Sequence, residues 1–330
     1  ALLSGDRLLW GAVESIYLSD IDFTQQSLDR TAIDIRCTLD CNFDDITLLQ
    51  TEIGFDIDGP GVTEIMNSNI DSTNIALRGS GDGLLILKES NFTSQEKVMT
   101  LSGLNTEITG TNAELSQGDG PAINVLEGQH DWNEFNVEKA YSSSDVTSVG
   151  IDAWYTSIQS TELTTNGYST GAIFEDSTLT AETALFINGK TTGIYGIQST
   201  FTFEDLSTST QQYGVRLADE SHLQTSTWTA NLHNTPLLLE QDSTAHARTF
   251  TPQNTAQGSS DAVGDGTFLY GGPTTSTVST TASGYLYETY VSFTDINNQP
   301  IQAEAYAHNF LSIGDTNGVA SLPLLSTGSM

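Results

Sequence analysis

Short segments in which apolar and polar residues alternate recur along most of this chain, and they predict β-strands with one buried face. Alternating or continuous apolar segments lie at 75–77, 84–87, 99–101, 123–125, 215–217 and 237–239. Turn sequences such as Asp58-Gly59-Pro60-Gly61 and Asn188-Gly189 separate such segments. The pattern therefore predicts an all-β chain of many short strands.

A second pattern, two polar or small residues followed by an apolar one, returns at a nearly fixed interval. The apolar residues that close these triplets are Ile21, Phe43, Ile70, Phe92, Ile108, Trp132, Ile158, Leu179, Phe201, Leu223 and Ala245. The sequence numbers of successive members differ by 22, 27, 22, 16, 24, 26, 21, 22, 22 and 22. A repeat of this length indicates a solenoid, in which each unit stacks on its neighbours.

An interval of about 22 residues accommodates three short strands and three turns, which make one coil of a parallel β-helix. Neighbouring coils in such a fold lie about 4.8 Å apart and are joined by backbone hydrogen bonds. We therefore predict a β-helix over residues 1–250, with Ile, Leu, Val and Phe facing inward. The uneven intervals, which are those of 27, 16, 24 and 26, predict loops that protrude from the rod. A large β-sandwich would also explain the strands, but it does not explain the regular interval.

Two segments show the repeat at its clearest. They are 171–179 (Gly-Ala-Ile-Phe-Glu-Asp-Ser-Thr-Leu) and 214–223 (Gly-Val-Arg-Leu-Ala-Asp-Glu-Ser-His-Leu). They resemble coils of the right-handed parallel β-helix proteins of the pectin-lyase-like superfamily, and the resemblance covers about residues 15–250. It implies right-handed coils and an extracellular or surface protein. Because the same solenoid carries enzymes, adhesins and structural proteins, it indicates a fold more than a function.

The pattern changes after Arg248. Residues 251–283 are rich in Thr, Ser, Gly and Gln and predict a linker or a cap. Residues 284–330 begin with a cleanly alternating strand at 285–293 and resemble a small Ig-like module of the carboxypeptidase-regulatory type. Such a sandwich normally needs about seven strands, and fewer are visible. The module is therefore either incomplete or completed by a strand from elsewhere.

The charge of the chain restricts its partners. The 42 Asp and Glu residues against 10 Lys and Arg residues give a formal net charge of −32. This balance argues against nucleic acid and anionic membranes as partners. No apolar run reaches the length of a membrane span, so we expect no membrane insertion. Three explanations fit the acidity. The first is adaptation to salty water, as in marine or archaeal proteins. The second is the solvated surface of an extracellular protein, and the third is Ca²⁺ binding. Asp56 and Asp58 are the candidate ligands for Ca²⁺, the one cofactor considered.

Two further features bear on the compartment. Cys37 and Cys41 can form a disulfide only if a tight corner separates them, because an extended strand would hold their Cα atoms roughly 13 Å apart. Otherwise they are two small buried residues. A disulfide would indicate an oxidising, extracellular location. Asn91 begins the one glycosylation sequon, Asn91-Phe92-Thr93.

The search for catalytic groups yields no candidate residue. Arg78 follows Asp56 by one regular interval of the repeat but lies in a Gly-rich turn, so we expect no partnership between them. The aromatic residues suit either a sugar-binding platform or the core; they are Trp132, Trp154, Tyr155 and Trp228. We therefore expect a non-enzymatic structural or adhesive surface protein that self-associates into a surface layer, sheath or filament. The alternative is a β-helix protein that binds or degrades polysaccharide.

Overall fold

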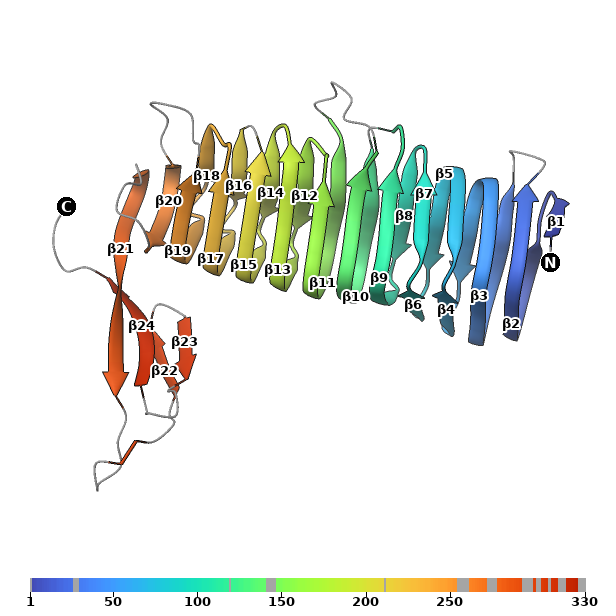
Figure 1. The fold of residues 1–330 in the computed structure, drawn as a ribbon, viewed down its shortest axis with the longest axis horizontal. Coiled ribbons are helices and arrows are strands. Elements are labelled where there is room, and N and C mark those ends of the chain that lie inside the picture. The colour runs from blue at the N-terminus through green and yellow to red at the C-terminus, as the bar shows by residue number, and fades with distance from the viewer. Residues whose placement is uncertain are drawn as a thin grey trace.

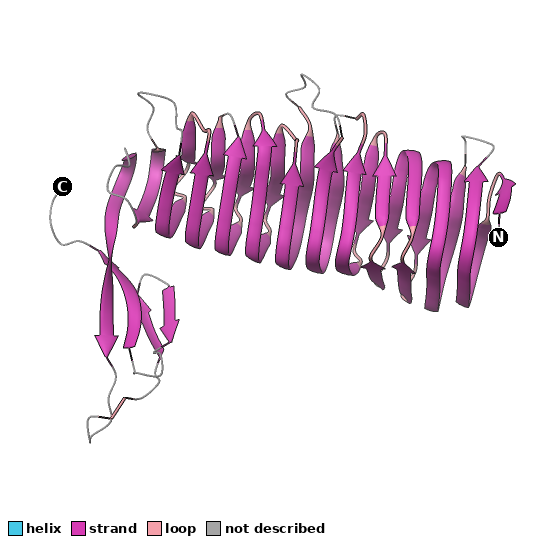
Figure 2. Ribbon diagram, in the orientation of Figure 1, coloured by secondary structure: helices cyan, strands magenta, loops and turns pink. Residues whose placement is uncertain are grey.

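The structure, a computed structural model, describes residues 2–25, 30–118, 120–140, 147–210, 212–253, 261–271, 278–292, 299–300, 304–307, 310–313 and 319–325. These residues form 24 strands and no helix (Figure 2). The strands are β1 (Leu2–Gly5), β2 (Leu9–Gln25), β3 (Thr31–Asp58), β4 (Val62–Met66), β5 (Asn69–Ser80), β6 (Leu84–Lys88), β7 (Asn91–Ser94), β8 (Lys97–Ser102), β9 (Asn105–Leu115), β10 (Pro121–Lys139), β11 (Val149–Asn166), β12 (Thr170–Glu175), β13 (Thr178–Gly189), β14 (Thr192–Ile197), β15 (Thr200–Thr210), β16 (Tyr213–Ala218), β17 (His222–Asn231), β18 (Thr235–Leu239), β19 (Thr244–Gln253), β20 (Ala262–Tyr270), β21 (Val278–Ser292), β22 (Glu304–Ala307), β23 (Phe310–Ile313) and β24 (Val319–Leu325).

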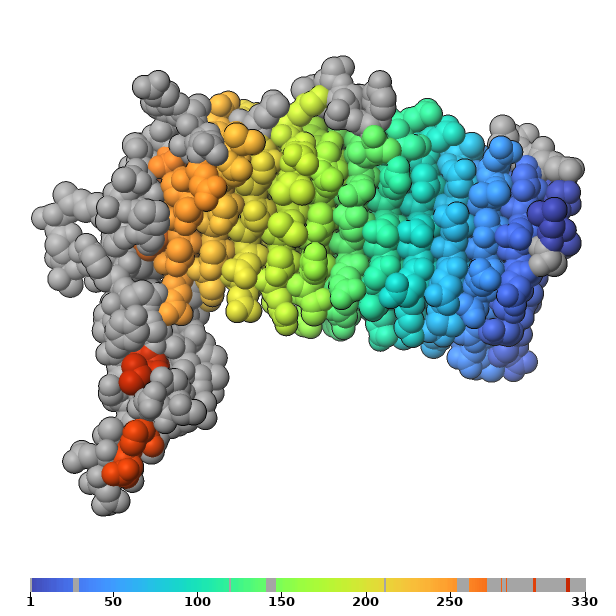
Figure 3. Space-filling view, in the orientation of Figure 1, coloured from blue at the N-terminus to red at the C-terminus, as the bar shows by residue number. Residues whose placement is uncertain are grey.

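The chain winds into a parallel β-solenoid of about 11 turns, which forms a long rod (Figure 1). Each turn has three faces, and the coil at 192–210 defines them here. Face 1 contains β14, face 2 contains residues 200–203 of β15, and face 3 contains residues 205–210 of the same strand. Every face pairs in parallel register with the corresponding face of the next coil. The coils form successive bands across the rod in the space-filling view (Figure 3).

The core consists of inward side chains that stack on their counterparts in neighbouring coils. One such line on face 2 runs from Leu179 through Phe201 and Leu223 to Ala245, each paired with the next. All four are at most 2% exposed. Because each coil buries its apolar residues only against the coils beside it, stability is distributed along the rod as a sum of nearest-neighbour contacts.

Buried serines explain the repeating triplet. Ser177, Ser199, Ser221 and Ser243 stack at the corner between faces 1 and 2, and the backbone N–H of each of the first three donates to the Ser Oγ of the next coil. The Ser199 hydroxyl in turn donates to the carbonyl of Ile197. A residue with positive φ precedes the serine and turns the chain, as Gln198 does at 49°. The serine hydroxyl thus accepts a hydrogen bond from a buried backbone N–H that has no partner in the sheet because the chain turns there.

Removing one of these hydroxyls should destabilise the rod. In Ser199→Ala the buried N–H of Ser177 loses its acceptor, so we expect the free energy of unfolding to fall by about 1–3 kcal/mol. Urea unfolding followed by circular dichroism measures this change. Ser207→Ala, at a half-exposed outward position of face 3, is the matched control and should change it by less than about 0.5 kcal/mol. Equal effects of the two variants would contradict this role for the serine stack.

The uneven intervals have two different causes, and two of them are not the loops that the sequence predicted. Ser68 and Ser90 lie at the corner between faces 2 and 3, whereas Ser177 lies at the corner between faces 1 and 2. The intervals of 27 and 16 therefore arise from comparing two different corners.

The pairing of the strands restores the regular interval at both places. The true partner of Phe43 in the next coil is Ile65, and that of Leu87 is Ile108. Neither pair encloses additional residues, so no loop protrudes from the rod at these two coils.

The longer intervals near Trp132 do reflect inserted residues. Ile108 pairs with Trp132, and Trp132 pairs with Ser160, so both of these coils are longer than the regular repeat. The second insertion lies between β10 and β11, and its residues 141–146 are outside the described part of the chain.

The solenoid extends past residue 250, where the sequence predicted a linker or cap. β20 pairs in parallel with β18 and β19, and residues 278–285 of β21 pair in parallel with β20. The coil continues because 262–270 alternates like the coils before it, with Phe268 buried. Beyond this point β21 pairs antiparallel with β24, and β22 pairs antiparallel with β23. The described strands of 284–330 do not by themselves show the predicted Ig-like sandwich.

Candidate functional site

Cys37 and Cys41 lie at a tight corner of β3. The strand contains one more residue there than β2, because Val13 pairs with Cys37 while Ser15 pairs with Asp40. The bulge brings the two Cα atoms to 6.2 Å, and the sulfur atoms are joined in a disulfide. Both cysteines are buried. The disulfide therefore holds this corner of β3 together near the N-terminal end of the rod.

Asp56 and Asp58, the candidate Ca²⁺ ligands, point outward from face 1. Asp56 pairs in register with Arg78 of the next coil, and the Arg78 Nη1 lies 3.0 Å from the Asp56 Oδ2. The expectation that these two residues are unrelated was therefore wrong, because Arg78 belongs to β5 and not to the Gly-rich turn. Burial raises the pKa of Asp56 more than Arg78 lowers it. The Arg78 guanidinium contacts one carboxylate oxygen of Asp56, which a bound Ca²⁺ ion would have to share. Ca²⁺ binding at Asp56 and Asp58 therefore stays a prediction.

Asn91 is exposed on β7 at the edge of face 3. It belongs to a ladder of asparagines, in which the Asn112 Nδ2 donates to the Asn91 Oδ1 at 3.0 Å. Asn69 and Asn91 are paired in register one coil earlier. Asparagine ladders of this kind stabilise stacked strands, so the ladder gives Asn91 a structural role whether or not it carries a glycan.

The four aromatic residues considered for a sugar-binding platform are divided by the fold. Trp132 and Trp228 are completely buried in the core. Trp154 and Tyr155 are 38% and 56% exposed at the corner that ends face 1. The Trp154 indole N–H donates to the Asp152 Oδ1 at 2.7 Å, which fixes the orientation of its ring. The structure thus does not bring the four together.

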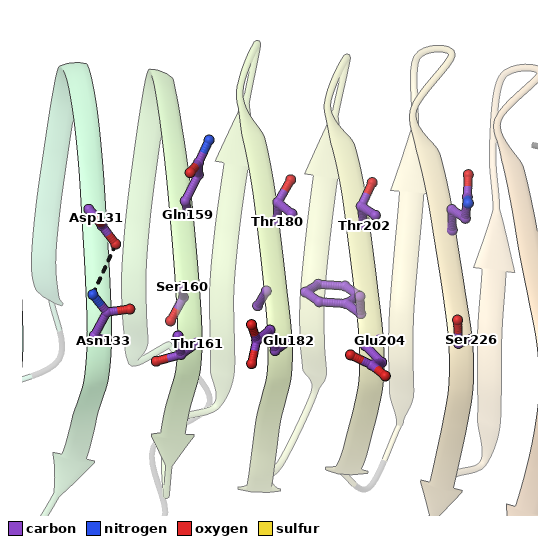
Figure 4. Close-up of a pocket in the computed structure, with 13 residues that line it drawn as sticks. Asp131, Asn133, Gln159, Ser160, Thr161, Thr180, Glu182, Thr202, Glu204 and Ser226 are labelled. Carbon is purple, nitrogen blue, oxygen red and sulfur yellow. Dashed lines mark hydrogen bonds between the residues drawn. The ribbon is translucent and has the colours of Figure 1, made fainter. Parts of the chain in front are cut away.

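A shallow groove of about 630 Å³ runs lengthwise along face 2. Its outward side chains form two rows across successive coils (Figure 4). The rows contain Asp131, Gln159, Thr180 and Thr202 on one side, and Asn133, Thr161, Glu182, Glu204 and Ser226 on the other. The Asn133 Nδ2 donates to the Asp131 Oδ1 at 3.1 Å. No Lys or Arg of the described chain lines this groove, so its potential is negative.

The groove offers hydrogen-bonding groups to a polyhydroxylated ligand. Glu182 and Glu204 lie on adjacent coils, about 4.8 Å apart by the spacing of the sheet. A pair of carboxyl groups on adjacent coils is also the kind of pair with which glycosidases act. The groups that line the groove therefore suit either binding or hydrolysis of a polyhydroxylated ligand.

Two buried Trp–Thr–His clusters, which the sequence alone did not indicate, lie inside the rod. In the first, the Trp132 Nε1 donates to the Thr106 Oγ1 at 2.9 Å, and that hydroxyl is 2.9 Å from the His130 Nδ1. Burial lowers the pKa of His130 to about 4. The only sequence signal was a polar residue at an inward position of the coil.

The second cluster repeats this arrangement nearer the C-terminal end of the rod. The Trp228 Nε1 donates to the Thr208 Oγ1 at 3.0 Å, and the His233 Nε2 lies 3.0 Å from the same oxygen. The Thr210 N–H points at the His233 Nδ1 at 3.4 Å, so this nitrogen is the unprotonated acceptor. Burial lowers the pKa of His233 to about 4. The second cluster therefore holds a neutral imidazole.

Among the described residues there is no group of three or more His, Cys, Asp or Glu side chains suited to a metal ion. None of the described elements is a helix long and apolar enough to span a bilayer. Comparisons with protein-family models, with curated proteins and with solved structures find no match to this chain.

Proposed function

We propose that the chain is an extracellular structural and adhesive protein, a rod-shaped subunit of a surface layer, sheath or filament. The observation that carries this proposal is the rod itself. About 11 coils present the same three faces, which pair in parallel from one coil to the next. A long surface with a constant repeat suits contacts that are themselves repeated along a layer or fibre, whereas a catalytic site needs one local constellation of groups.

Two further features support this function. The disulfide between Cys37 and Cys41 fits an oxidising compartment outside the cell. The net charge of −32 keeps a carboxylate-rich surface hydrated and suits a saline habitat. We further propose that the solenoid is right-handed and pectin-lyase-like and that its tail forms an Ig-like terminal module, of which the antiparallel pairs β21–β24 and β22–β23 would be part.

Polysaccharide binding or degradation is the second candidate, and the groove on face 2 favours it. Carboxylate, amide and hydroxyl groups converge there, as they do where proteins hold sugars. The row that contains Glu182 and Glu204 would repel an acidic polysaccharide. A glycan bound in the groove is therefore expected to be neutral or to carry amino groups.

Electron microscopy of the purified chain tests the structural proposal. We expect regular filaments or sheets at high salt, where a Debye length of about 3 Å at 1 M screens the repulsion between acidic rods. The same preparation is incubated with neutral, amino and acidic polysaccharides, and released products are measured. Dispersed particles at every salt concentration, together with release of sugar, would overturn the structural role in favour of the second candidate.

A further inference from the structure

The groove on face 2 is longer than the hollow described above, because two further hollows continue it along the rod. A hollow of about 410 Å³ shares Asp131 and Gln159 with it, and another of about 360 Å³ shares Thr202 and Gln224. We call the three hollows together the long groove. Its middle row of outward side chains reads, in register, Glu107, Asp131, Gln159, Thr180, Thr202, Gln224 and His246.

The long groove has the length of an extended polymer segment. Its middle row begins after Ile86, which pairs with Glu107, and ends before Leu269, which pairs with His246. Ile86 and Leu269 are apolar and half-buried, so they bound the polar row at its two ends. The row crosses seven successive coils and is about 29 Å long at a spacing of about 4.8 Å per coil. A ligand that uses the whole row must therefore be long and lie along the rod.

The middle of the long groove carries hydrogen-bonding groups that the protein itself does not use. Among the described residues, the side chains of Gln159, Thr180 and Thr202 have no hydrogen-bond partner. The outward asparagines of face 3 differ, because they bond to one another from coil to coil, as Asn112 does with Asn91. Amide and hydroxyl groups can each donate and accept, as the hydroxyl groups of a sugar do. The middle row therefore keeps donors and acceptors for a polyhydroxylated ligand.

The charges of the long groove exclude an acidic ligand. Within the described chain its lining contains no Lys or Arg, and it contains the carboxylates of Glu107, Asp131, Glu182 and Glu204. None of the ion pairs found among the described residues involves these four carboxylates. A polymer with carboxylate, sulfate or phosphate groups would therefore meet uncompensated negative charge. An uncharged polyhydroxylated chain would instead donate hydrogen bonds to the same carboxylates.

We infer that the long groove binds one unbranched, uncharged polysaccharide chain, which lies lengthwise along the rod. The hydroxyl groups of this chain bond to Gln159, Thr180 and Thr202, which stand in register on three successive coils. Contacts that recur from coil to coil add up along one ligand chain, so affinity rises with the number of sugar units until the groove is full. The inference rests on polysaccharide binding, the second candidate function, and names its ligand class and the orientation of the ligand.

Isothermal titration calorimetry of the full chain with oligosaccharides of increasing length tests the inference. The probes run from disaccharides to octasaccharides in three classes, which are uncharged (cello-, xylo- and manno-oligosaccharides), amino (chitosan oligosaccharides) and acidic (oligogalacturonates). Salt at about 1 M suppresses attraction to the overall charge of the rod. We expect the affinity for an uncharged series to rise at least about tenfold from disaccharide to hexasaccharide, and the acidic series not to bind. Affinity that is independent of length, or binding of the amino or acidic series alone, would overturn the inference.

Two variants of β15 locate the ligand. Thr202→Arg fills the middle of the long groove and should weaken hexasaccharide binding at least about tenfold. Ser207→Arg adds the same side chain at a half-buried outward position of face 3 and should leave binding unchanged. The double variant Thr180→Ala, Thr202→Ala removes two hydroxyl groups without adding bulk and should weaken binding at least about threefold, with an unchanged circular dichroism spectrum.

The possible failures are distinguishable. Equal weakening by Thr202→Arg and Ser207→Arg would overturn the assignment to the long groove and leave polysaccharide binding standing. A chain that binds none of the oligosaccharides would overturn both the inference and the second candidate function. Regular filaments in electron microscopy would still support the structural role in either case.

Discussion

Between pH 7 and pH 5, the free energy of unfolding should fall by about 2 kcal/mol for each of the two buried histidines, or about 4 kcal/mol together. His130 and His233 have a pKa of about 4 in the folded chain and about 6.5 in the unfolded chain. Above pH 6.5 both states hold a neutral imidazole, and the contribution is complete. As the pH falls from 6.5 toward 4 only the unfolded state gains protons, so stability is progressively lost, and below pH 4 the loss levels off.

Urea unfolding at half-unit steps of pH measures this loss, and stopping at pH 5 stays above the ordinary carboxyl pKa of about 4. His130→Asn and His233→Gln retain a side-chain donor and acceptor without the titration. The double variant should therefore lose most of the fall in stability between pH 6.5 and 5. His222→Gln, on the exposed surface of β17, serves as the control and should retain it. A double variant with the wild-type pH profile would show that the buried imidazoles are not responsible.

Phe201→Ala should lower the free energy of unfolding by about 3–5 kcal/mol, because it removes buried surface and leaves a cavity. The Phe201 ring is fully buried and makes an edge-to-face contact with Phe174 at 5.4 Å and a stacked contact with Phe203 at 6.4 Å. The cavity would lie between two coils whose stability depends on each other. The loss should therefore weaken the array on both sides of the substituted coil.

Thermal and urea unfolding measure this change, with Thr200→Ala as the control. Thr200 precedes Phe201 in the same strand but is exposed, so its truncation should cost less than about 0.5 kcal/mol. Hydrogen exchange then locates the loss, which should be greatest at the backbone amides of β13, β15 and β17. A uniform loss of protection along the whole rod would show that the coils unfold as one unit and not as coupled neighbours.

The regular interval predicted the coil because the same inward position must be apolar in every turn. From Leu179 to Ala245 the series follows one line of face 2, so sequence spacing and spatial register coincide. Near the N-terminal end they diverge, because the triplet that marks Ile70 and Phe92 belongs to face 3. A Ser-x-apolar triplet indicates that a corner is present but does not say which of the three corners it forms.

The pairing of outward residues was harder to predict than the coil. Arg78 was assigned to a turn because glycines follow it closely, yet it continues β5 and meets Asp56 across two coils. The Trp–Thr–His clusters escaped prediction because the threonine of each lies 20 to 26 residues from its Trp and His partners. Contacts of this kind depend on the length of each intervening coil, and a difference of one residue would turn the side chain to the opposite side of the sheet.

The sequence by itself determined that the chain is an all-β solenoid, because periodic burial is a local requirement that each coil must meet. It also determined the acidic surface, since charge depends on composition alone. Only the tertiary structure decided which outward residues share a face. The placement of Asp56 against Arg78 on one face, and of Glu182 with Glu204 in one groove, depends on how many residues each turn contains. That number is set by the backbone hydrogen bonds between coils, which join residues one whole turn apart in the sequence.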